Sequence, residues 1–274
     1  MSALKLALCQ MRSGVDPARN IDDAEAMIRE AAANGARLIA TPETTHLMQR
    51  EREALFAALR PPQEEPAIVR FSDLAEALGA TLVIGSLALQ GPDGRAVNRQ
   101  HVFGPDGALL ATYDKVHMFD VKIGAGEHYQ ESANYAPGSR AVTVDAAGTK
   151  LGLSICYDVR FAYLYRRLAQ AGASILTVPS AFTKPTGRAH WEVLLRARAI
   201  ETGSFVIAPA QGGKHEDGRK TYGHSLVIGP WGEVIAEKED DEPGLLYAEI
   251  DPRDAAEARA RIPALSGDQE ITGP

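Results

Sequence analysis

Short apolar runs rich in β-forming residues alternate with amphipathic helical stretches along most of this chain. Leu4–Gln10 is the first apolar run, and the helical stretch after it should begin at the capping residue Asn20 and end at Gly35. Apolar residues recur on this stretch at the spacing that places them on one helical face. This alternation predicts strand–helix–strand units and therefore an α/β fold.

The middle of the chain has a different pattern. Turn signals at residues 91–94 and 104–107 separate short alternating strands, and the second turn should join strands 100–103 and 108–113 as a hairpin. Residues 122–139 lack periodicity and contain several Gly, which indicates a long ordered loop of the kind that is usually functional. Hairpins mixed with strand–helix–strand units predict two sheets packed face to face with helices outside.

The pattern continues to a last strand at residues 245–250 without a linker, a low-complexity tract or a block of like charge. A length of 274 residues alone would also fit two small domains. Because nothing divides the chain, we predict a single domain, 1–274, in which the charged, Ala-rich tail from about Pro252 has no strong assignment.

The charge balance argues against several classes of partner. The chain has 29 basic and 36 acidic side chains and a net charge of -7, whereas nucleic acid and anionic membranes need clustered Lys and Arg. No stretch reaches the roughly 20 apolar residues of a membrane span, and the first apolar run is too short for a signal peptide. Cys9 and Cys156 allow at most one disulfide. We therefore expect a soluble, cytoplasmic protein with reduced thiols and no nucleic-acid or membrane partner.

Cys156 follows the apolar strand 151–155 and precedes a helical stretch. At such a junction a thiol can point into a cleft, where helix-start amides would lower its pKa and bind an oxyanion. The alternative is a small buried hydrophobic side chain, which is how we interpret Cys9 inside the first strand.

Glu43 and Lys115 also stand at strand ends. Glu43 follows the apolar run 37–41, where a carboxylate is costly to desolvate, although a capping residue is the simpler interpretation of Glu43 alone. Lys115 alone would pass as a solvated surface residue. With Cys156 they make a complete catalytic set. A carboxylate whose pKa is raised by an apolar pocket takes the thiol proton, and Lys115 with the Tyr157 amide stabilises an oxyanion.

Other catalytic classes have weaker support in the sequence. Seven His residues leave a Cys–His hydrolase open, but no spacing singles one of them out. His190-Trp-Glu192 and His215-Glu216 lack the HExxH spacing of a zinc hydrolase, and no GxGxxG or phosphate-binding loop is present. We therefore predict neither a metal nor a nucleotide at the site.

Three segments that carry these residues resemble the signatures of the nitrilase (carbon–nitrogen hydrolase) superfamily in order and spacing. They are Thr-Pro-Glu at 41–43, Tyr-Asp-Lys-Val-His-Met-Phe-Asp at 113–120 and Gly-Leu-Ser-Ile-Cys-Tyr-Asp-Val-Arg-Phe at 152–161. Further matches extend the resemblance from about the first strand to Ile250. The resemblance implies a four-layer αββα sandwich, usually paired as a homodimer or higher homo-oligomer.

The resemblance also implies a Glu–Lys–Cys triad that needs no metal or organic cofactor. Glu43 would be the general base, Lys115 the transition-state stabiliser, and Cys156 the nucleophile of an amidase that passes through a thioester. Glu131 matches a second family carboxylate, which orients the Lys and lies near the leaving group. The helix after Cys156 and the helix at 190–201 match segments that commonly form the dimer face.

Within the superfamily, segments 180–182, 190–201 and 222–225 are most similar to nitrilase-like amidases that act on deaminated glutathione. Omega-amidases, which hydrolyse 2-oxoglutaramate, are close neighbours. The sequence departs from the usual pattern at Ala162-Tyr163, at Gln211-Gly212-Gly213 and in the tail. An N-carbamoyl amino acid hydrolase, an aliphatic amide or nitrile hydrolase, and a catalytically silent binding member therefore stay open.

Substrates of both enzymes are small amides that carry an α-keto carboxylate, which a buried cation should bind. Arg160, four residues after the nucleophile, is our candidate, and an ion pair with Asp158 is the alternative interpretation. Phe182 and Thr183 are the other residues predicted to bind substrate.

Overall fold

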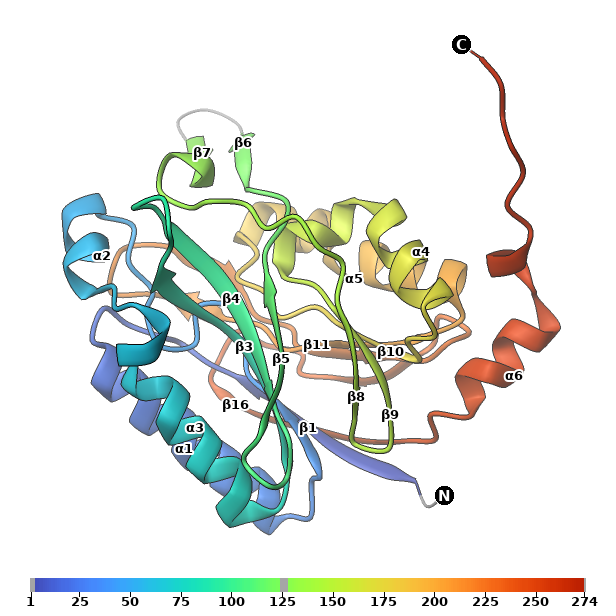
Figure 1. The fold of residues 1–274 in the computed structure, drawn as a ribbon, viewed down its shortest axis with the longest axis horizontal. Helices are drawn as coiled ribbons and strands as arrows, with labels where there is room; N and C mark the ends of the chain where they lie inside the picture. The colour runs from blue at the N-terminus through green and yellow to red at the C-terminus, as the bar shows by residue number, and fades with distance from the viewer. Residues whose placement is uncertain (1–2, 124–127, 274) are drawn as a thin grey trace.

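The protein has four layers, two sheets packed face to face between two layers of helices (Figure 1). This computed structural model describes residues 3–123 and 128–273. The predicted αββα sandwich is confirmed.

The first sheet places parallel strands in its centre. In order, its strands are β16 (Gly244–Ile250), β1 (Leu4–Gln10), β2 (Leu38–Ala40), β3 (Thr81–Gln90), β4 (Ala96–Phe103) and β5 (Leu109–Asp114). β1, β2 and β3 are parallel, because helical segments connect them, whereas β4 and β5 form the predicted antiparallel hairpin.

The second sheet has the same plan. In order, its strands are β15 (Val234–Glu237), β14 (Leu226–Ile228), β11 (Phe205–Ala208), β10 (Ile175–Thr177), β9 (Thr149–Leu153) and β8 (Thr143–Ala146). β9, β10 and β11 are parallel. Two small antiparallel pairs lie apart from both sheets: β6 (Asp120–Lys122) with β7 (His128–Gln130), and β12 (Gly212–Lys214) with β13 (Lys220–Tyr222).

Helices cover the outer face of each sheet. α1 (Pro17–Ala33) and α3 (Pro66–Leu78) pack on the first sheet, and α4 (Ala162–Gln170) and α5 (Lys184–Thr202) pack on the second. Within the described ranges, every helix is too short or too polar to serve as a transmembrane span.

Alternate side chains of β1 contribute to the apolar cores on the two faces of its sheet. Leu6 and Leu8 point into the core cluster that holds both sheets together, whereas Ala7 and Cys9 point into the cluster under α1 and α3. Successive strand residues face opposite sides, so a strand covered on both faces is apolar throughout. The interpretation of Cys9 as a small buried hydrophobic residue is confirmed, since its side chain is fully buried.

Two local predictions differ from the structure. Asp16, followed by Pro17, caps α1, while Asn20 lies inside the helix and bonds the backbone of Gly14 and His46. Asp16 is the capping residue because its carboxylate accepts hydrogen bonds from two free amides of the first turn. The predicted loop at 122–139 contains β7, and residues 124–127 of that loop lie outside the described residues.

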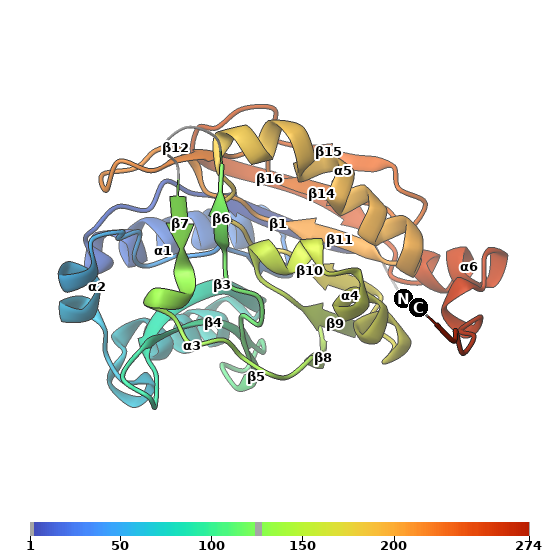
Figure 2. The same ribbon diagram turned by 90° about the horizontal axis from the view of Figure 1, so that it is seen from above.

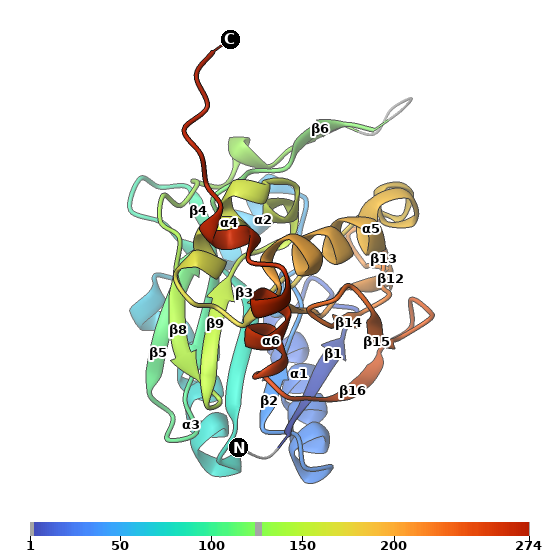
Figure 3. The same ribbon diagram turned by 90° about the vertical axis from the view of Figure 1, so that its right-hand side faces the viewer.

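The two ends of the molecule hold helices that the sequence pattern did not indicate. α2 (Arg52–Ala58) and α6 (Asp254–Arg261) lie at opposite ends (Figure 2). α6 occupies the tail that had no assignment, and the segment after it returns to α4 (Figure 3), where Arg166 and Gln170 bond Asp268. Two buried Ala residues give α6 only a narrow apolar face, which explains why periodicity misses it.

Two buried His residues make the stability of the fold sensitive to acid. Burial lowers the pKa of His46 to about 4 and that of His101 to about 3, from an ordinary value of 6.5. The unfolded chain therefore takes up protons below about pH 6.5, whereas the folded chain does not until the lowered values are reached.

We expect the free energy of unfolding to be fully retained above about pH 7 and to fall as the pH decreases from 6.5 towards 4. Each His should contribute a slope of about 1.4 kcal/mol per pH unit. Urea unfolding at several pH values measures this slope. A His101→Leu variant should lose the share of the slope that His101 contributes and keep the rest, and an unchanged slope in that variant would contradict the assignment.

Candidate active site

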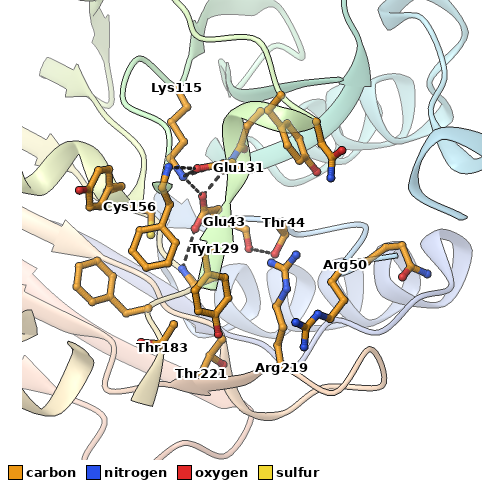
Figure 4. A pocket seen from close by; sticks show the side chains of 18 of the residues that line it. Glu43, Thr44, Arg50, Lys115, Tyr129, Glu131, Cys156, Thr183, Arg219 and Thr221 are labelled. Atoms are coloured by element: carbon orange, nitrogen blue, oxygen red, sulfur yellow. Dashed lines mark hydrogen bonds and ion pairs between the residues drawn. The ribbon is translucent and has the colours of Figure 1, made fainter. Parts of the chain in front are cut away.

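Glu43, Lys115 and Cys156 come together from three distant parts of the chain (Figure 4). Lys115 Nζ lies 2.9 Å from Glu43 Oε1, and Cys156 lines the same cavity as both of them. All three side chains are buried. The fold explains their meeting, because Glu43 follows β2, Lys115 follows β5 and Cys156 follows β9, strands of the two facing sheets.

Glu43 is held by donors on both oxygens. Asn98 Nδ2 donates to Oε1 at 2.9 Å, and the Ala181 amide donates to Oε2 at 2.9 Å. The next residue, Thr44, has φ of 57°, in the left-handed region. A carboxylate with this many fixed donors has one orientation, which suits a group that must exchange a proton repeatedly.

Lys115 lies between two carboxylates. Glu131 accepts from its Nζ at 3.0 and 2.8 Å, and Glu131 Oε2 also accepts from the Phe119 amide at 2.6 Å. Glu131 begins the short 3₁₀ turn Glu131–Ala133, directly after β7. The residue predicted to orient Lys115 is therefore in contact with it.

Cys156 stands in a strained turn, not at the start of a regular α-helix. Its φ is 49°, and it begins the 3₁₀ segment Cys156–Arg160, which precedes α4. Its own amide donates to Pro179 O at 2.9 Å and so cannot bind an oxyanion. The Tyr157 amide is the next donor along the turn, as the sequence analysis expects.

A single buried carboxylate ties the Cys156 turn to the Lys115 segment. Asp158 accepts from the Ile155 amide at 3.0 Å, from Tyr113 Oη at 2.7 Å and from the His117 amide at 3.0 Å. Ile155 is adjacent to Cys156, and Tyr113 and His117 each lie two residues from Lys115. Asp158 thus fixes their relative position, and nothing links it to Arg160.

The protonation states differ from those expected from the sequence. Burial favours a neutral Glu43, but the Lys115 charge and the hydrogen bonds from Lys115 and Asn98 outweigh it and lower the pKa of the Glu43 carboxyl. Burial, followed by the Glu43 charge, raises the pKa of the Cys156 thiol well above its ordinary value. Both predicted directions, a raised pKa for Glu43 and a lowered one for Cys156, are wrong.

Those directions could not be read from the sequence because they depend on which charges surround each group. Burial disfavours the charged form of Lys115, yet the charges of Glu131 and Glu43 outweigh burial and raise the Lys115 pKa well above the ordinary value. The resting site therefore holds a neutral thiol and, in the same cavity, a carboxylate that an ammonium group keeps ionised. Glu43 is thus in the state that can accept the thiol proton.

A cavity of about 200 Å³ opens onto the triad. Phe182 and Thr183, predicted to bind substrate, line it together with Tyr157. Arg160 does not belong to the described lining. Its guanidinium lies over the rings of Tyr157 and Phe182, at 5.7 and 5.6 Å from their centroids, and Nη2 is 3.2 Å from His190 Nδ1. Neither direct exposure to the cavity nor the alternative pairing with Asp158 is seen for Arg160.

Other lining residues were not singled out by the sequence analysis. They include Asn98, Tyr129, Arg50, Arg219 and Thr221. Asn98 stands in β4 beside three other polar residues, Arg99, Gln100 and His101, so the sequence gives no signal that distinguishes it. Arg50 and Arg219 stand in connecting segments that carry no local signal for a site. Among the described residues no His, Cys, Asp and Glu side chains are grouped as metal ligands would be.

Known proteins similar to this chain identify its family. The carbon-nitrogen hydrolase family model matches residues 5–260. Deaminated glutathione amidase of Synechocystis sp. is 40% identical over 269 residues, which cover 94% of this chain and 96% of that protein. Omega-amidase NIT2 of Homo sapiens is 36% identical over 263 residues, which cover 96% of this chain and 94% of that protein.

A solved structure extends the similarity to three dimensions. Saccharomyces cerevisiae Nit3, a member of branch 10 of the nitrilase superfamily, matches with a TM-score of 0.86 and 29% identity, covering 97% of this chain and 96% of that chain. Fold, family match and identity to amidases point the same way. The chain belongs to the carbon–nitrogen hydrolase family of the nitrilase superfamily and is an amidase.

Proposed function

We propose that this protein is a thiol amidase that hydrolyses deaminated glutathione, or a related ω-amide of an α-keto acid. The observation that carries the chemistry is that the Cys156 thiol and the Glu43–Lys115 ion pair line the wall of one cavity. The substrate class is supported by the 40% and 36% identity to the two amidases named above.

The first half of the reaction forms a thioester. Cys156 Sγ attacks the amide carbonyl carbon as Glu43 takes the thiol proton, and the carbonyl π electrons move to oxygen. The Lys115 ammonium and the Tyr157 amide stabilise this oxyanion. When the oxyanion collapses, the C–N bond breaks and the amine nitrogen takes the proton from Glu43.

The second half returns the enzyme to its resting state. Glu43 takes a proton from a water molecule, and the oxygen of this water attacks the thioester carbon. The C–S bond then breaks, the sulfur takes the proton back, and the carboxylic acid leaves. Since Glu43 has a lowered pKa in the presence of Lys115, it is ionised and ready at neutral pH before each half-reaction.

Turnover of a substrate panel tests the proposal. We expect the highest kcat/KM for deaminated glutathione, with 2-oxoglutarate and cysteinylglycine as products, followed by 2-oxoglutaramate. N-carbamoyl amino acids, simple amides and simple nitriles should be slower by at least about 10²-fold, because they lack the α-keto acid half of the proposed substrates. Chromatography with mass detection measures all products.

The competing functions make different predictions in the same panel. A higher kcat/KM for a carbamoyl amino acid, a simple amide or a nitrile would overturn the substrate class. A silent binding member would turn over nothing and would leave no acyl group on Cys156 when quenched protein is weighed by mass spectrometry.

We also propose a cytoplasmic homodimer that pairs through α4 and α5. Tyr163, Val193 and Ile200 on these two helices are large apolar residues that are 57%, 68% and 55% exposed. Apolar side chains in such numbers on neighbouring helices favour a protein partner. Both cysteines are free, as reduced thiols would be. Sedimentation and cell fractionation are the measurements that decide these two points.

A further inference from the structure

Arg219 enters the cavity at the side away from Cys156. It stands directly before β13, and the cavity is also lined by Arg50 from the segment after Glu43. Figure 4 shows both side chains beyond Thr44, on the side of Glu43 opposite to Cys156. The active-site cavity therefore has a cationic end and a nucleophilic end.

The Arg219 guanidinium is held in place but keeps donors to spare. Asp217 Oδ1 accepts from the Arg219 amide at 2.9 Å, and Asp217 Oδ2 lies 3.2 Å from Arg219 Nε. Nη1 contacts only the Met48 sulfur, at 3.5 Å. Within the described residues, Nη2 of Arg219 and the whole Arg50 guanidinium have no hydrogen-bond partner. A fixed Arg with unused donors at a cavity wall is suited to bind a carboxylate.

The inner part of the cavity repels a carboxylate. Glu43 and Glu131 flank the single positive charge of Lys115, so these three buried groups carry a net charge of about -1 when all are ionised. Tyr135 also lines the cavity, and its phenol interacts with the charges of Arg219, Glu131, Glu43 and Lys115. Because a single ring lies within reach of both groups of charges, the cationic end and the triad belong to one continuous site.

The direction of the reaction assigns the cationic end to the leaving group. Glu43 gives its proton to the departing nitrogen, so this nitrogen must lie on the Glu43 side of Cys156. Thr44 and Arg219 line the same cavity beyond Glu43, so a chain attached to that nitrogen has room to extend towards Arg219 (Figure 4).

We propose that Arg219, assisted by Arg50, binds the terminal carboxylate of a peptide-like leaving group, and so makes the enzyme prefer peptide amides to primary amides. The inference rests on the proposed function and deepens it. In deaminated glutathione the leaving group is a dipeptide with a free carboxylate, whereas in 2-oxoglutaramate it is ammonia. Arg219 therefore contributes to the binding of deaminated glutathione and not to that of 2-oxoglutaramate.

Arg219→Gln separates the two substrates. We expect kcat/KM for deaminated glutathione to fall about 10- to 100-fold, mostly through KM, and kcat/KM for 2-oxoglutaramate to stay within about twofold of wild type. Arg219→Lys should recover part of the loss. Arg37→Gln, a change of an exposed Arg before β2, is the matched control and should alter neither substrate.

A modified substrate gives the second arm of the experiment. Converting the terminal carboxylate of deaminated glutathione to an amide should lower kcat/KM of the wild type by the same factor. Arg219→Gln should not lower kcat/KM for this amidated substrate any further. An equal loss on 2-oxoglutaramate would place Arg219 at the keto-acid half and overturn the inference, as would full activity of wild type on the amidated substrate.

Binding of the product dipeptide keeps the inference testable if the proposed substrate is wrong. Cysteinylglycine should bind the Cys156→Ala protein at least about tenfold more tightly than its terminal amide does, and Arg219→Gln in that background should abolish the difference. Calorimetry measures both. Failure of wild type to hydrolyse deaminated glutathione, with this difference intact, would refute the substrate but support the carboxylate site. Equal affinities would refute the site.

Discussion

Cys156→Ala and Cys156→Ser should each lower kcat by at least about 10⁴-fold without unfolding the protein. Ala removes the nucleophile, and Ser replaces the thiol with a hydroxyl, which is a weaker nucleophile towards an amide than sulfur is. The Glu43–Lys115 ion pair and its bonds to Asn98 and Ala181 remain in both variants. The fold therefore keeps its support while the chemistry is lost.

The backbone at the nucleophile adds a stability readout to this prediction. Cys156 has φ of 49°, which costs a non-Gly residue roughly 1 kcal/mol or more. Cys156→Gly should therefore be more stable than Cys156→Ala by about 1 kcal/mol and equally inactive. Denaturant unfolding of the variants measures the difference.

Cys9→Ala is the matched control for the loss of a buried thiol. Cys9 lies in β1 under α1 and α3, away from the cavity, so the variant should keep kcat/KM within about threefold and lose only packing energy. If Cys156→Ala retained near-wild-type turnover, or if Cys9→Ala were the inactive variant, the assignment of the nucleophile would be wrong.

The triad is predictable from sequence because its three members stand at strand ends, where a local pattern is visible. Each of Glu43, Lys115 and Cys156 follows an apolar run, and the facing sheets bring these ends together. Glu131 could be identified only through the family resemblance, since a Glu in an aperiodic stretch has no local signal. The layers are predictable for the same reason, because the alternation of strands and helices is also a local pattern.

The remaining features depend on contacts between distant segments. Asp158 bonds residues that flank Lys115, more than 35 positions away, and no spacing in the sequence encodes that. Arg219 reaches the cavity because the β12–β13 pair places it there, whereas Arg160, which looked better placed, packs behind two aromatic rings. The protonation states likewise follow from the neighbours of each group and not from its strand.

Lys115→Met should abolish turnover and also destabilise the fold, by about 3–5 kcal/mol at neutral pH. Lys115 Nζ lies 2.9 Å from Glu43 and 2.8 Å from Glu131, and its side chain is 2% exposed. Its removal leaves two buried carboxylates facing each other without a cation. Since two adjacent buried charges of like sign are costly, one of the two carboxyl groups should have its pKa raised above the unfolded value.

That raised pKa sets the pH dependence of the damage. A group with a raised folded-state pKa favours the fold below its unfolded pKa, and this contribution is lost as the pH rises through the folded value. The stability gap between Lys115→Met and wild type should therefore be small near pH 5 and grow to a plateau in the alkaline range. The protonation of His46 and His101 affects both proteins alike, so it cancels in the difference.

Glu131→Gln in the Lys115→Met background separates folding from catalysis. Gln keeps the shape of the side chain and removes one of the two facing charges, so the double variant should regain part of the lost stability and show a smaller pH dependence, but recover no activity. Urea unfolding between pH 5 and 8, with turnover measured on the same samples, tests this. A stability gap that does not change with pH, or a double variant no more stable than the single one, would mean that the Lys115 ammonium is not what allows Glu43 and Glu131 to remain charged side by side.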